Sequence, residues 1–290
     1  MTLPKTVFTY WHQGFDKAPP IVRACLSQLK KKNPGWNIYA LDERSVQKFV
    51  SVTEFSGEKI ASLNLAHRSD LIRTRLLIDH GGVWIDPTVF VTQAFDDWLL
   101  REMNAGLFLF SNPGRDRIVS NWFIASNPGH PILIRLYDTL CSYWEDNRFR
   151  NHGRPPTDFE RLLHRAIDRN LVLPALWFSW PFRKVLRLYP YMVYHYLFGE
   201  IVRNDQYLGS IFSKMPILSA DGPHRLQRLG LGLPYSSKSE MVLDDKSVPL
   251  HKLSHELDLS EVGRESVIGH LIDLAGTAGQ GEVFKGSQFR

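Results

Sequence analysis

The chain has 290 residues, is 43% hydrophobic and carries a formal net charge of +5. Its size and hydrophobic content are enough for one large domain, and its two cysteines are too few for a disulfide framework, which fits a reducing compartment. The N-terminal segment shows no secretion signal and no run of about 18 apolar residues occurs, so we expect a cytoplasmic protein without a membrane span. The basic residues are scattered and accompany no nucleic-acid-binding motif, so no nucleic-acid partner is expected.

The first fifty residues predict a β–α–β start. A strand is expected over residues 5–10, an amphipathic helix over residues 21–31 and a second strand over residues 36–41. This order predicts a parallel sheet. Asp42 follows the second strand and is interpreted either as a ribose contact or as the N-cap of a helix over residues 43–50.

A helix is predicted for the stretch that follows Asn64, because apolar residues recur there at helical spacing. Asn64 is a candidate N-cap, and the pair Gly81-Gly82 would end the helix because glycine tolerates a left-handed backbone. Asp70 and Arg73 are three residues apart and therefore share one face of this helix.

A short β-rich run, residues 83–85, comes next and places Asp86 at the end of a strand. We expect the chain to turn back here and to bring Asp70, Arg73 and Asp86 to one edge of a sheet. Carboxylates bind divalent metals, and arginine binds phosphate through two hydrogen bonds. The pattern therefore favours a nucleotide diphosphate with a divalent cation.

Strands and helices continue to alternate beyond this point. Strands are predicted over residues 106–110 and 121–125, and an amphipathic helix over residues 132–144. A further helix is predicted over residues 158–168. The side chains expected to face inward on it are Phe159, Leu162, Leu163 and Ile167.

An unusual composition marks residues 171–198, where aromatic side chains interleave with Arg183, Lys184 and Arg187. Such a segment suits a membrane interface, with aromatic rings at the headgroup boundary and cations on anionic lipid. The alternative is a buried aromatic subdomain whose long cationic side chains extend to solvent.

The order S-D-x-x-R followed by G-G-x-aromatic-x-D resembles the sugar-nucleotide-binding region of the DxD glycosyltransferases. The similar families are the bacterial capsular polysaccharide synthesis proteins, the fungal α-1,6-mannosyltransferases and the glucosylating clostridial toxins. The resemblance implies that Asp70, Arg73 and Trp84 hold the donor and that Asp86 binds the metal. Thr88 stands where a second acid is usual. The capsular branch is similar to this W-I-D-[AP]-T variant, which implies ligation through the Thr88 hydroxyl or through water.

Two other strands match the same families. The pattern P-K-x-[IV]-x-x-x-W-x-x-G ends near Trp11, which the resemblance makes a stacking platform for uracil; a core tryptophan is the alternative. The run that begins at Asn121 resembles N-x-F-[IM]-A-x-x-P-x-[HN]-P, which implies a contact with a sugar hydroxyl; a turn or strand-edge asparagine is the alternative. The families also carry an acid near the reacting sugar, for which Asp158 and Glu160 are candidates.

A late turn and a late His-Lys pair complete the resemblance. Residues 217–224 resemble a turn that packs under the nucleotide site. His251 would be a further metal ligand and Lys252 would contact the leaving diphosphate, as in the H-K-L-[ST] of the capsular branch. His224 and His255 compete with His251 for the metal.

The implied fold is α/β and GT-A-like, with a Rossmann-like, mainly parallel central sheet flanked by helices and an added helical, aromatic-rich region. We expect a single catalytic domain over residues 1–275, in which residues 140–200 form a helical insertion facing the acceptor or the membrane. Residues 276–290 are rich in glycine and polar residues and predict a loose tail.

The implied reaction moves a sugar from a nucleotide diphosphate sugar, preferably a UDP-sugar, to a hydroxyl of a capsular or other surface polysaccharide precursor, with retention of configuration. Asp86, Arg73 and Lys252 would carry catalysis with Mn²⁺ or Mg²⁺. The acceptor would be lipid-linked or an oligosaccharide, and the protein would contact the cytoplasmic face of the inner membrane. Two rival interpretations are a glycoside hydrolase, which needs two opposed carboxylates, and a nucleotide-sugar binder with little or no activity, suggested by Thr88.

Overall fold

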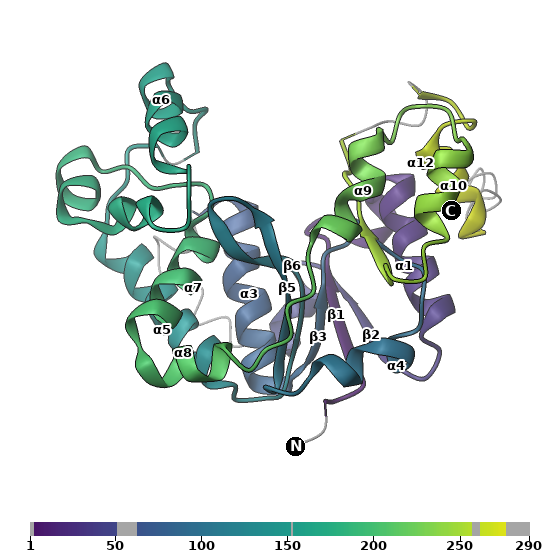
Figure 1. The fold of residues 1–290 in the computed structure, drawn as a ribbon, viewed down its shortest axis with the longest axis horizontal. Helices are drawn as coiled ribbons and strands as arrows, with labels where there is room; N and C mark the ends of the chain where they lie inside the picture. Colours follow the sequence, from purple (N-terminus) through teal and green to yellow (C-terminus); the bar gives the residue numbers. More distant parts are fainter. Residues whose placement is uncertain (1–2, 51–62, 152, 257–261, 277–290) are drawn as a thin grey trace, which may run out of the picture. The chain divides into compact units, whose positions relative to one another are not determined.

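The computed structural model describes residues 3–50, 63–151, 153–256 and 262–276. Strands and helices alternate along the chain (Figure 1). The strands are β1 (Thr6–Tyr10), β2 (Asn37–Leu41), β3 (Gly82–Ile85), β4 (Val89–Val91), β5 (Leu107–Gly114), β6 (Arg117–Ser126) and β7 (Leu250–Lys252). The α-helices are α1 (Pro20–Lys32), α3 (Leu65–His80), α4 (Phe95–Trp98), α5 (Pro131–Asp146), α6 (Asp158–Ile167), α7 (Val193–Asn204), α8 (Gln206–Phe212), α9 (Asp221–Leu229), α10 (Ser237–Leu243) and α12 (Val267–Leu274). Short 3-10 or π-helical segments are η1 (Phe15–Lys17), η2 (Ser45–Lys48), η4 (Leu99–Glu102), η5 (Leu173–Phe178) and η6 (Pro181–Leu186). The predicted tail lies, from residue 277 on, outside the described residues.

Five strands form one sheet in the order β2-β1-β3-β6-β5. β1 and β3 pair in parallel, with Val7 opposite Val83 and Phe8 opposite Trp84. β5 and β6 form an antiparallel hairpin at the edge, because the short turn that joins them allows only antiparallel pairing. The predicted α/β class is confirmed, and the hairpin is an addition that the pattern of the sequence did not indicate.

By compactness the chain divides into two units, each built from three stretches. Unit 1 consists of Met1–Phe8, Arg44–Trp84 and Arg101–Ala220. Unit 2 consists of Thr9–Glu43, Ile85–Leu100 and Asp221–Arg290. The single catalytic domain expected over residues 1–275 stays a prediction. The two compact units divide the chain without testing whether it acts as one catalytic domain.

α3 of unit 1 begins and ends as the sequence predicts. The Asn64 side chain accepts a hydrogen bond from the backbone N–H of His67 at 2.9 Å and so caps the helix. Gly81 (φ 63°) ends the helix and Gly82 (φ 87°) begins β3. A Cβ on Gly82 would lie 2.3 Å from the carbonyl oxygen of Thr6, so glycine is required where the chain turns into the sheet.

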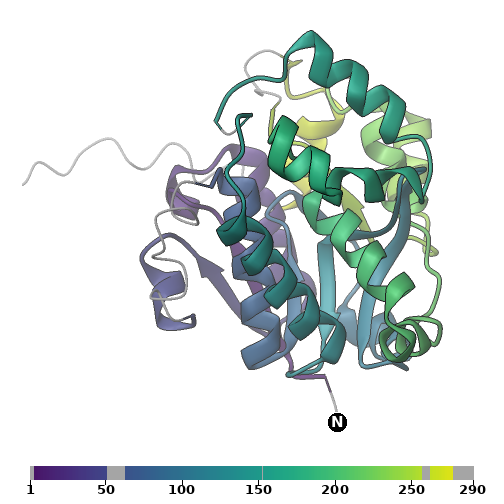
Figure 2. The same ribbon diagram turned by 90° about the vertical axis from the view of Figure 1, so that its left-hand side faces the viewer.

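In unit 1, α3 and α7 pack against β6 of the sheet, and α5 packs on both helices. α7 also contacts α8. Figure 2 looks onto these helices, with α5 in teal and α7 in green side by side. The predicted apolar face of α5 is confirmed, because Ile132, Leu136, Leu140 and Tyr143 are all buried.

The prediction for α6 is wrong in part. Leu163 and Ile167 pack in an apolar cluster that includes Trp177. Phe159 and Leu162, also predicted to face inward, are 55% and 60% exposed. The helical spacing identified the residues that lie near one another on the helix, but it did not show how much of that face the rest of the unit covers.

The aromatic-rich segment that follows α6 combines both sequence-based interpretations. Its buried cluster contains Ile167, Trp177, Leu188 and Tyr196, which matches the buried-subdomain interpretation. Other apolar side chains of the same segment remain in contact with solvent. Within the described ranges, no helix is both long and apolar enough to cross a bilayer.

Unit 2 is built around α1, β4 and β7. α1 packs on β4 and on α12, β4 pairs antiparallel with β7, and α9 packs on β7. Cys25 of α1 lies in this core, where burial raises the pKa of its thiol to about 12. The thiol is therefore protonated and unreactive near neutral pH.

Candidate functional site

A hydrogen-bonded cluster surrounds Asp70 in unit 1. Asp70 is buried on α3, and its Oδ1 accepts a hydrogen bond from Asn121 Nδ2 of β6 at 2.8 Å. The same oxygen lies 3.5 Å from Arg73 Nη2. The predicted shared face of Asp70 and Arg73 is confirmed. Asn121, which the sequence indicated as a sugar contact, is brought to the same carboxylate.

Arg73 is fixed by groups of the protein on several sides. Its Nη1 donates to the Asn121 carbonyl at 2.5 Å, and its Nε donates to the Ser69 carbonyl at 3.2 Å. The guanidinium also lies over the Trp84 ring, 5.0 Å from the ring centroid. Arg73 is 6% exposed and is held beside Asp70. Its predicted contact with donor phosphates stays a prediction.

Two residues of this cluster were missed by sequence reasoning. His67 is buried one helical turn before Asp70, with its Nδ1 3.7 Å from Asp70 Oδ2 and its ring against Trp144. Tyr194 is buried on α7, and burial raises the pKa of its phenol, with Arg73 opposing and Asp70 adding to the shift. The H-x-x-D spacing was an available signal for His67, whereas nothing in the sequence linked Tyr194 to α3.

A second cluster lies in unit 2, where β3 ends. Asp86 and Thr88 belong to a turn closed by a hydrogen bond from the Val89 N–H to the Asp86 carbonyl at 3.1 Å. Lys252 of β7 donates from Nζ to Thr88 Oγ1 at 2.7 Å and to the Leu253 carbonyl at 3.0 Å. Thr88 and Lys252, which the resemblance singled out separately, are therefore direct neighbours.

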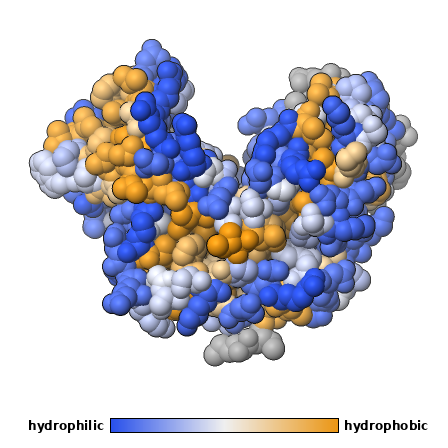
Figure 3. All heavy atoms as spheres, in the orientation of Figure 1, coloured by the Kyte–Doolittle hydropathy of each residue, from blue (hydrophilic) through white to orange (hydrophobic). Residues whose placement is uncertain are grey.

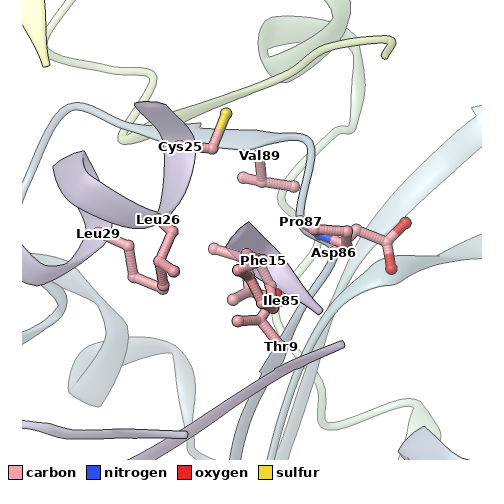
Figure 4. A pocket seen from close by; sticks show the side chains of 9 residues that line it. All are labelled: Thr9, Phe15, Cys25, Leu26, Leu29, Ile85, Asp86, Pro87 and Val89. Carbon is pink, nitrogen blue, oxygen red and sulfur yellow. The ribbon is translucent and has the colours of Figure 1, made fainter. Parts of the chain in front are cut away.

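Asp86 does not point into the interior of unit 2. Figure 4 shows its carboxylate directed away from the side chains of Cys25, Leu26 and Leu29, with which it lines a cavity. The volume of that cavity is about 10 Å³, which is room for about one water molecule and far too little for a nucleotide. The cavity is thus a packing gap of the core, and the carboxylate lies outside it.

His251 lies on the opposite face of β7 from Lys252, because successive strand residues point to opposite faces. It pairs with Phe90 of β4 in the strand register and has an exposure of 0%. Burial lowers the pKa of its imidazole to about 4. His251 is therefore a neutral core residue near pH 7.

The predicted ligand set of Asp86, Thr88 and His251 does not fit a divalent cation in this arrangement. His251 is enclosed in the core, and the Thr88 hydroxyl accepts a hydrogen bond from the Lys252 ammonium. Among the residues that the structure describes, no three His, Cys, Asp or Glu side chains are grouped to hold a metal. The structure thus removes His251 from the predicted ligand set, and the Mn²⁺ or Mg²⁺ itself stays a prediction.

The loop after β1 carries Trp11. Its ring is half-buried against the core of unit 2 and meets the His255 ring edge-on, 5.4 Å between centroids. Its stacking role stays a prediction. Tyr10, His12 and Glu43 form a neighbouring network that sequence reasoning missed. Tyr10 donates to Glu43 Oε2 at 2.7 Å, and His12 Nδ1 lies 3.1 Å from the same oxygen.

The two acids considered near the reacting sugar both make contacts at the start of α6, and their place near the sugar stays a prediction. Glu160 closes a capping box with Thr157 and pairs with Arg154 at 2.6 Å, and the hydrogen bond from Arg154 lowers the pKa of its carboxyl. Asp158 pairs with Arg161 at the surface.

The predicted site residues thus fall into two sets. The set in unit 1 is Asp70, Arg73, Trp84 and Asn121. The set in unit 2 is Trp11, Asp86, Thr88, His251 and Lys252. Each set has the internal geometry given above, and the expected convergence of Asp70, Arg73 and Asp86 stays a prediction.

The family model of the capsular polysaccharide synthesis proteins matches residues 2–151, just over half of the chain. The chain belongs to this family. Nearly all residues of the unit 1 cluster, together with Trp11, Asp86 and Thr88, lie within the matched region, whereas His251 and Lys252 lie beyond it.

This capsular polysaccharide synthesis family member is also similar to named glycosyltransferases. It is 26% identical over 168 residues to the O-glycosyltransferase braB of Annulohypoxylon truncatum. The aligned region covers 50% of this chain and 39% of that protein. It is 23% identical over 146 residues to the uncharacterized glycosyltransferase L373 of Acanthamoeba polyphaga mimivirus, covering 48% of this chain and 55% of that protein. The chain thus spans roughly two fifths to just over half of the length of these relatives.

Among solved structures, the UDP-bound glycosyltransferase domain of the YGT toxin is similar at 10% identity. The match covers 84% of this chain and 89% of that one, with a TM-score of 0.41.

Proposed function

We propose that this capsular polysaccharide synthesis family member is a glycosyltransferase that moves a sugar from a nucleotide diphosphate sugar to a hydroxyl of a surface polysaccharide precursor. The observation that carries the proposal is the family match over residues 2–151, within which the S-D-x-x-R motif forms a preorganised cluster. The named glycosyltransferases among its relatives support the same class.

The proposed reaction breaks the bond between the anomeric carbon and the phosphate oxygen and forms a bond from that carbon to the acceptor oxygen. The acceptor hydroxyl loses its proton to the departing nucleotide diphosphate, so atoms and charge balance without a separate base. We retain the expected retention of configuration as part of the proposal. An NMR assignment of the product anomer tests that part alone.

Negative charge develops on the diphosphate as it leaves, and catalysis requires positive groups placed where that charge appears. Lys252 is the group that the unit 2 cluster offers, because its ammonium is fixed by Thr88 and Leu253. Asp86 supplies a carboxylate for the donor at the end of β3. Removing one such group typically raises the barrier by about 3 kcal/mol, roughly a hundredfold in rate.

The rival interpretation as a glycoside hydrolase is less well supported. It requires two opposed carboxylates, one of which is protonated as an acid. Asp70 instead accepts a hydrogen bond from Asn121 and faces the Arg73 guanidinium. The second rival, a binder without activity, differs from the proposal in turnover and not in ligand, so turnover must be measured.

A donor panel tests the proposal. UDP- and GDP-sugars are each incubated with the protein, with and without glycan acceptors, and release of the free nucleotide diphosphate is followed. A transferase releases it fastest with an acceptor and slowly to water alone. No release with any donor, despite a thermal shift on donor binding, would identify a binder, and cleavage of simple glycosides with no response to nucleotide sugars would identify a hydrolase.

Asp86→Asn is the variant that tests the predicted role of Asp86 in this assay. The carboxylate lies outside the core, so the variant should keep its melting temperature while losing transfer by a hundredfold or more. Full activity in this variant would remove Asp86 from the site.

We also propose that the segment from α6 to the end of the aromatic-rich region contacts an anionic membrane surface, which would suit a lipid-linked acceptor. Its exposed apolar side chains are Phe159, Leu162, Leu171, Val172, Leu176, Trp180, Val185 and Tyr191, between 37% and 70% exposed. Figure 3 shows hydrophobic surface in this part of unit 1, where Figure 1 labels α6, with hydrophilic surface beside it. Exposed cations on the same segment are Arg161, Arg165, Arg169 and Lys184. Apolar contacts and cations together favour anionic lipid.

Vesicle flotation tests this contact. The protein should float with phosphatidylglycerol-containing vesicles and not with purely phosphatidylcholine vesicles. The double variant Val172→Ser, Trp180→Ser should lose flotation, whereas Ile217→Ser, Met241→Ser, which alters equally exposed apolar residues elsewhere, should keep it. Equal flotation of both variants would refute the contact, and a change of oligomeric state in the first would identify a protein partner surface instead. The expected cytoplasmic location stays a prediction.

A further inference from the structure

The end of α5 carries two buried polar atoms that the protein leaves unpaired. Tyr143 is 5% exposed, and its hydroxyl has no hydrogen-bond partner among the described residues. Asn147, just beyond the helix, donates from Nδ2 to the Tyr143 carbonyl at 2.7 Å, while its buried Oδ1 has no partner in the same ranges. A buried polar atom without a hydrogen bond costs about 1–3 kcal/mol, so this place calls for a ligand or for water.

The segment η6 and its C-cap are attached to this end of α5 by two cations. Lys184 donates from Nζ to the Asp146 carbonyl at 2.7 Å, and Arg187 donates from Nε to the Arg148 carbonyl at 2.8 Å. The last carbonyls of a helix have no partner within the helix, and cations are favoured beside them. Lys184 and Arg187 therefore hold η6 against the end of α5.

Arg183 of η6 is not used in this way. Its Nε is buried, and its side chain makes no hydrogen bond or ion pair with any residue that the structure describes. The guanidinium lies near the Tyr143 phenol, because burial raises the pKa of that phenol and the charge of Arg183 opposes the shift. The Arg183 side chain as a whole is partly exposed, so an anion from outside can reach it.

The charge around this pair is positive. Residues 143–190 contain nine Lys or Arg against five Asp or Glu, so they carry +4 of the net +5 of the chain. Three of the five acids already pair with a neighbouring side chain, namely Asp158 with Arg161, Glu160 with Arg154, and Asp168 with His164. An anion that approaches Arg183 is therefore attracted by the surrounding charge.

Exposed apolar side chains flank the same guanidinium. Trp180 and Val185, which lie three residues before and two residues after Arg183, are 65% and 53% exposed. A free phosphate would gain nothing from these neighbours, whereas a phosphate joined to a hydrocarbon chain would bury them. The combination favours a phosphate that belongs to a lipid.

We infer that Arg183 and the Tyr143 hydroxyl form a binding site for the terminal phosphate of a lipid. A guanidinium binds phosphate through two parallel hydrogen bonds, and a terminal phosphate offers three acceptor oxygens and close to two negative charges. It can therefore accept hydrogen bonds from both side chains at once, whereas a phosphodiester has two free oxygens and one charge. The inference rests on the proposed function and deepens it, because it names the group by which a lipid-linked acceptor is held.

Isothermal titration of the full chain with dihexanoyl phosphatidic acid, kept below its micelle concentration, tests the site. The unaltered protein should bind this lipid, Arg183→Met should weaken binding roughly tenfold or more, and Arg183→Lys should recover part of the affinity. Tyr143→Phe should weaken binding several-fold without lowering the melting temperature, because the hydroxyl has no partner to lose among the described residues. Arg135→Met, which removes an exposed arginine of α5, should bind like the unaltered protein.

Two further ligands distinguish the sources of the phosphate. Dihexanoyl phosphatidylglycerol, a phosphodiester, and inorganic phosphate should each bind roughly tenfold more weakly than phosphatidic acid. Inorganic phosphate that binds as tightly would assign the site to a free anion and overturn the inference, as would equal affinity of the unaltered protein and Arg183→Met for phosphatidic acid. Because binding is measured without donor or turnover, a failed transfer assay beside intact lipid binding would count against the proposed function alone.

Discussion

The two clusters that hold the motif residues treat charge in different ways. In unit 1, Asp70 and Arg73 face each other with side-chain exposures of 11% and 7%, and Asn121 completes the contacts. In unit 2, the Lys252 ammonium is oriented by the neutral oxygens of Thr88 and Leu253. The difference teaches that the unit 1 cluster joins opposite charges on one helix, whereas the unit 2 cluster joins two residues that lie far apart in the sequence.

The largest expected effect separates the buried ion pair from an ordinary one. Arg73→Met should lower the free energy of unfolding by about 3–5 kcal/mol, because it leaves the Asp70 carboxylate buried without its guanidinium. Arg75→Met is the matched control on the same helix, where the pair with Asp79 is partly exposed and should contribute at most about 0.5 kcal/mol. Urea unfolding measures both. Similar losses of unfolding free energy in the two variants would show that the buried Asp70–Arg73 pair stabilises the fold no more than an exposed pair does.

The next prediction concerns the core side of β7. The pKa of His251 is lowered to about 4 by burial, so the unfolded state binds more protons than the folded state between about pH 4 and pH 6.5. Stability should therefore be complete above pH 6.5 and fall by about 3 kcal/mol as the pH drops toward 4. His251→Leu should remove this part of the pH dependence.

Urea midpoints between pH 4 and pH 7 measure the difference between the two proteins. His255→Leu, at an exposed position, serves as the control for the loss of a histidine. Parallel profiles for the unaltered protein and His251→Leu would mean that His251 is accessible to protons, and would reopen its assignment as a ligand.

A smaller effect tests the hydrogen bond that completes the unit 1 cluster. Asn121→Ala should cost about 2 kcal/mol of stability, since Asp70 Oδ1 loses a donor while remaining buried. Asn204→Ala removes an exposed amide that bonds to Glu200 and should change stability by less than about 0.5 kcal/mol. Thermal unfolding of both variants is the measurement, and equal shifts would argue that Asp70 is solvated.

The smallest effect on stability should fall in unit 2. Thr88→Val keeps the volume of the side chain but removes the acceptor of Lys252 Nζ, at a cost of about 1 kcal/mol. Thr92→Val removes a similar hydroxyl contact, to the Val248 carbonyl, and should cost about the same. Only Thr88→Val should weaken the UDP-dependent thermal shift. If both or neither weakened it, the orientation of Lys252 would not matter for the donor.

Local signals in the sequence predicted much of the fold and one half of the site. The Asn64 cap, the Gly81 ending of α3 and the shared face of Asp70 and Arg73 all follow from residues within a few positions of one another. The α5 face was equally predictable, because the whole of it became buried.

For contacts between residues far apart in the sequence, the residues could be identified, but the contact between them could not be predicted. Thr88 and Lys252 were each identified by resemblance, yet their hydrogen bond depends on the pairing of β4 with β7, which neither strand encodes alone. The same pairing sends His251 into the core. For Phe159 the spacing was read correctly, but the extent of the surface that covers α6 is a property of the whole unit.

The division of the chain into interleaved stretches has a consequence for how the protein is made. All stretches of unit 1 have left the ribosome once Ala220 has emerged, whereas unit 2 waits for the stretch that begins at Asp221. Because compact units tend to fold as they are completed during synthesis, we expect unit 1 to fold first. Until then the apolar side chains of α1 and β4 lack the later parts of the chain that bury them in the folded unit 2.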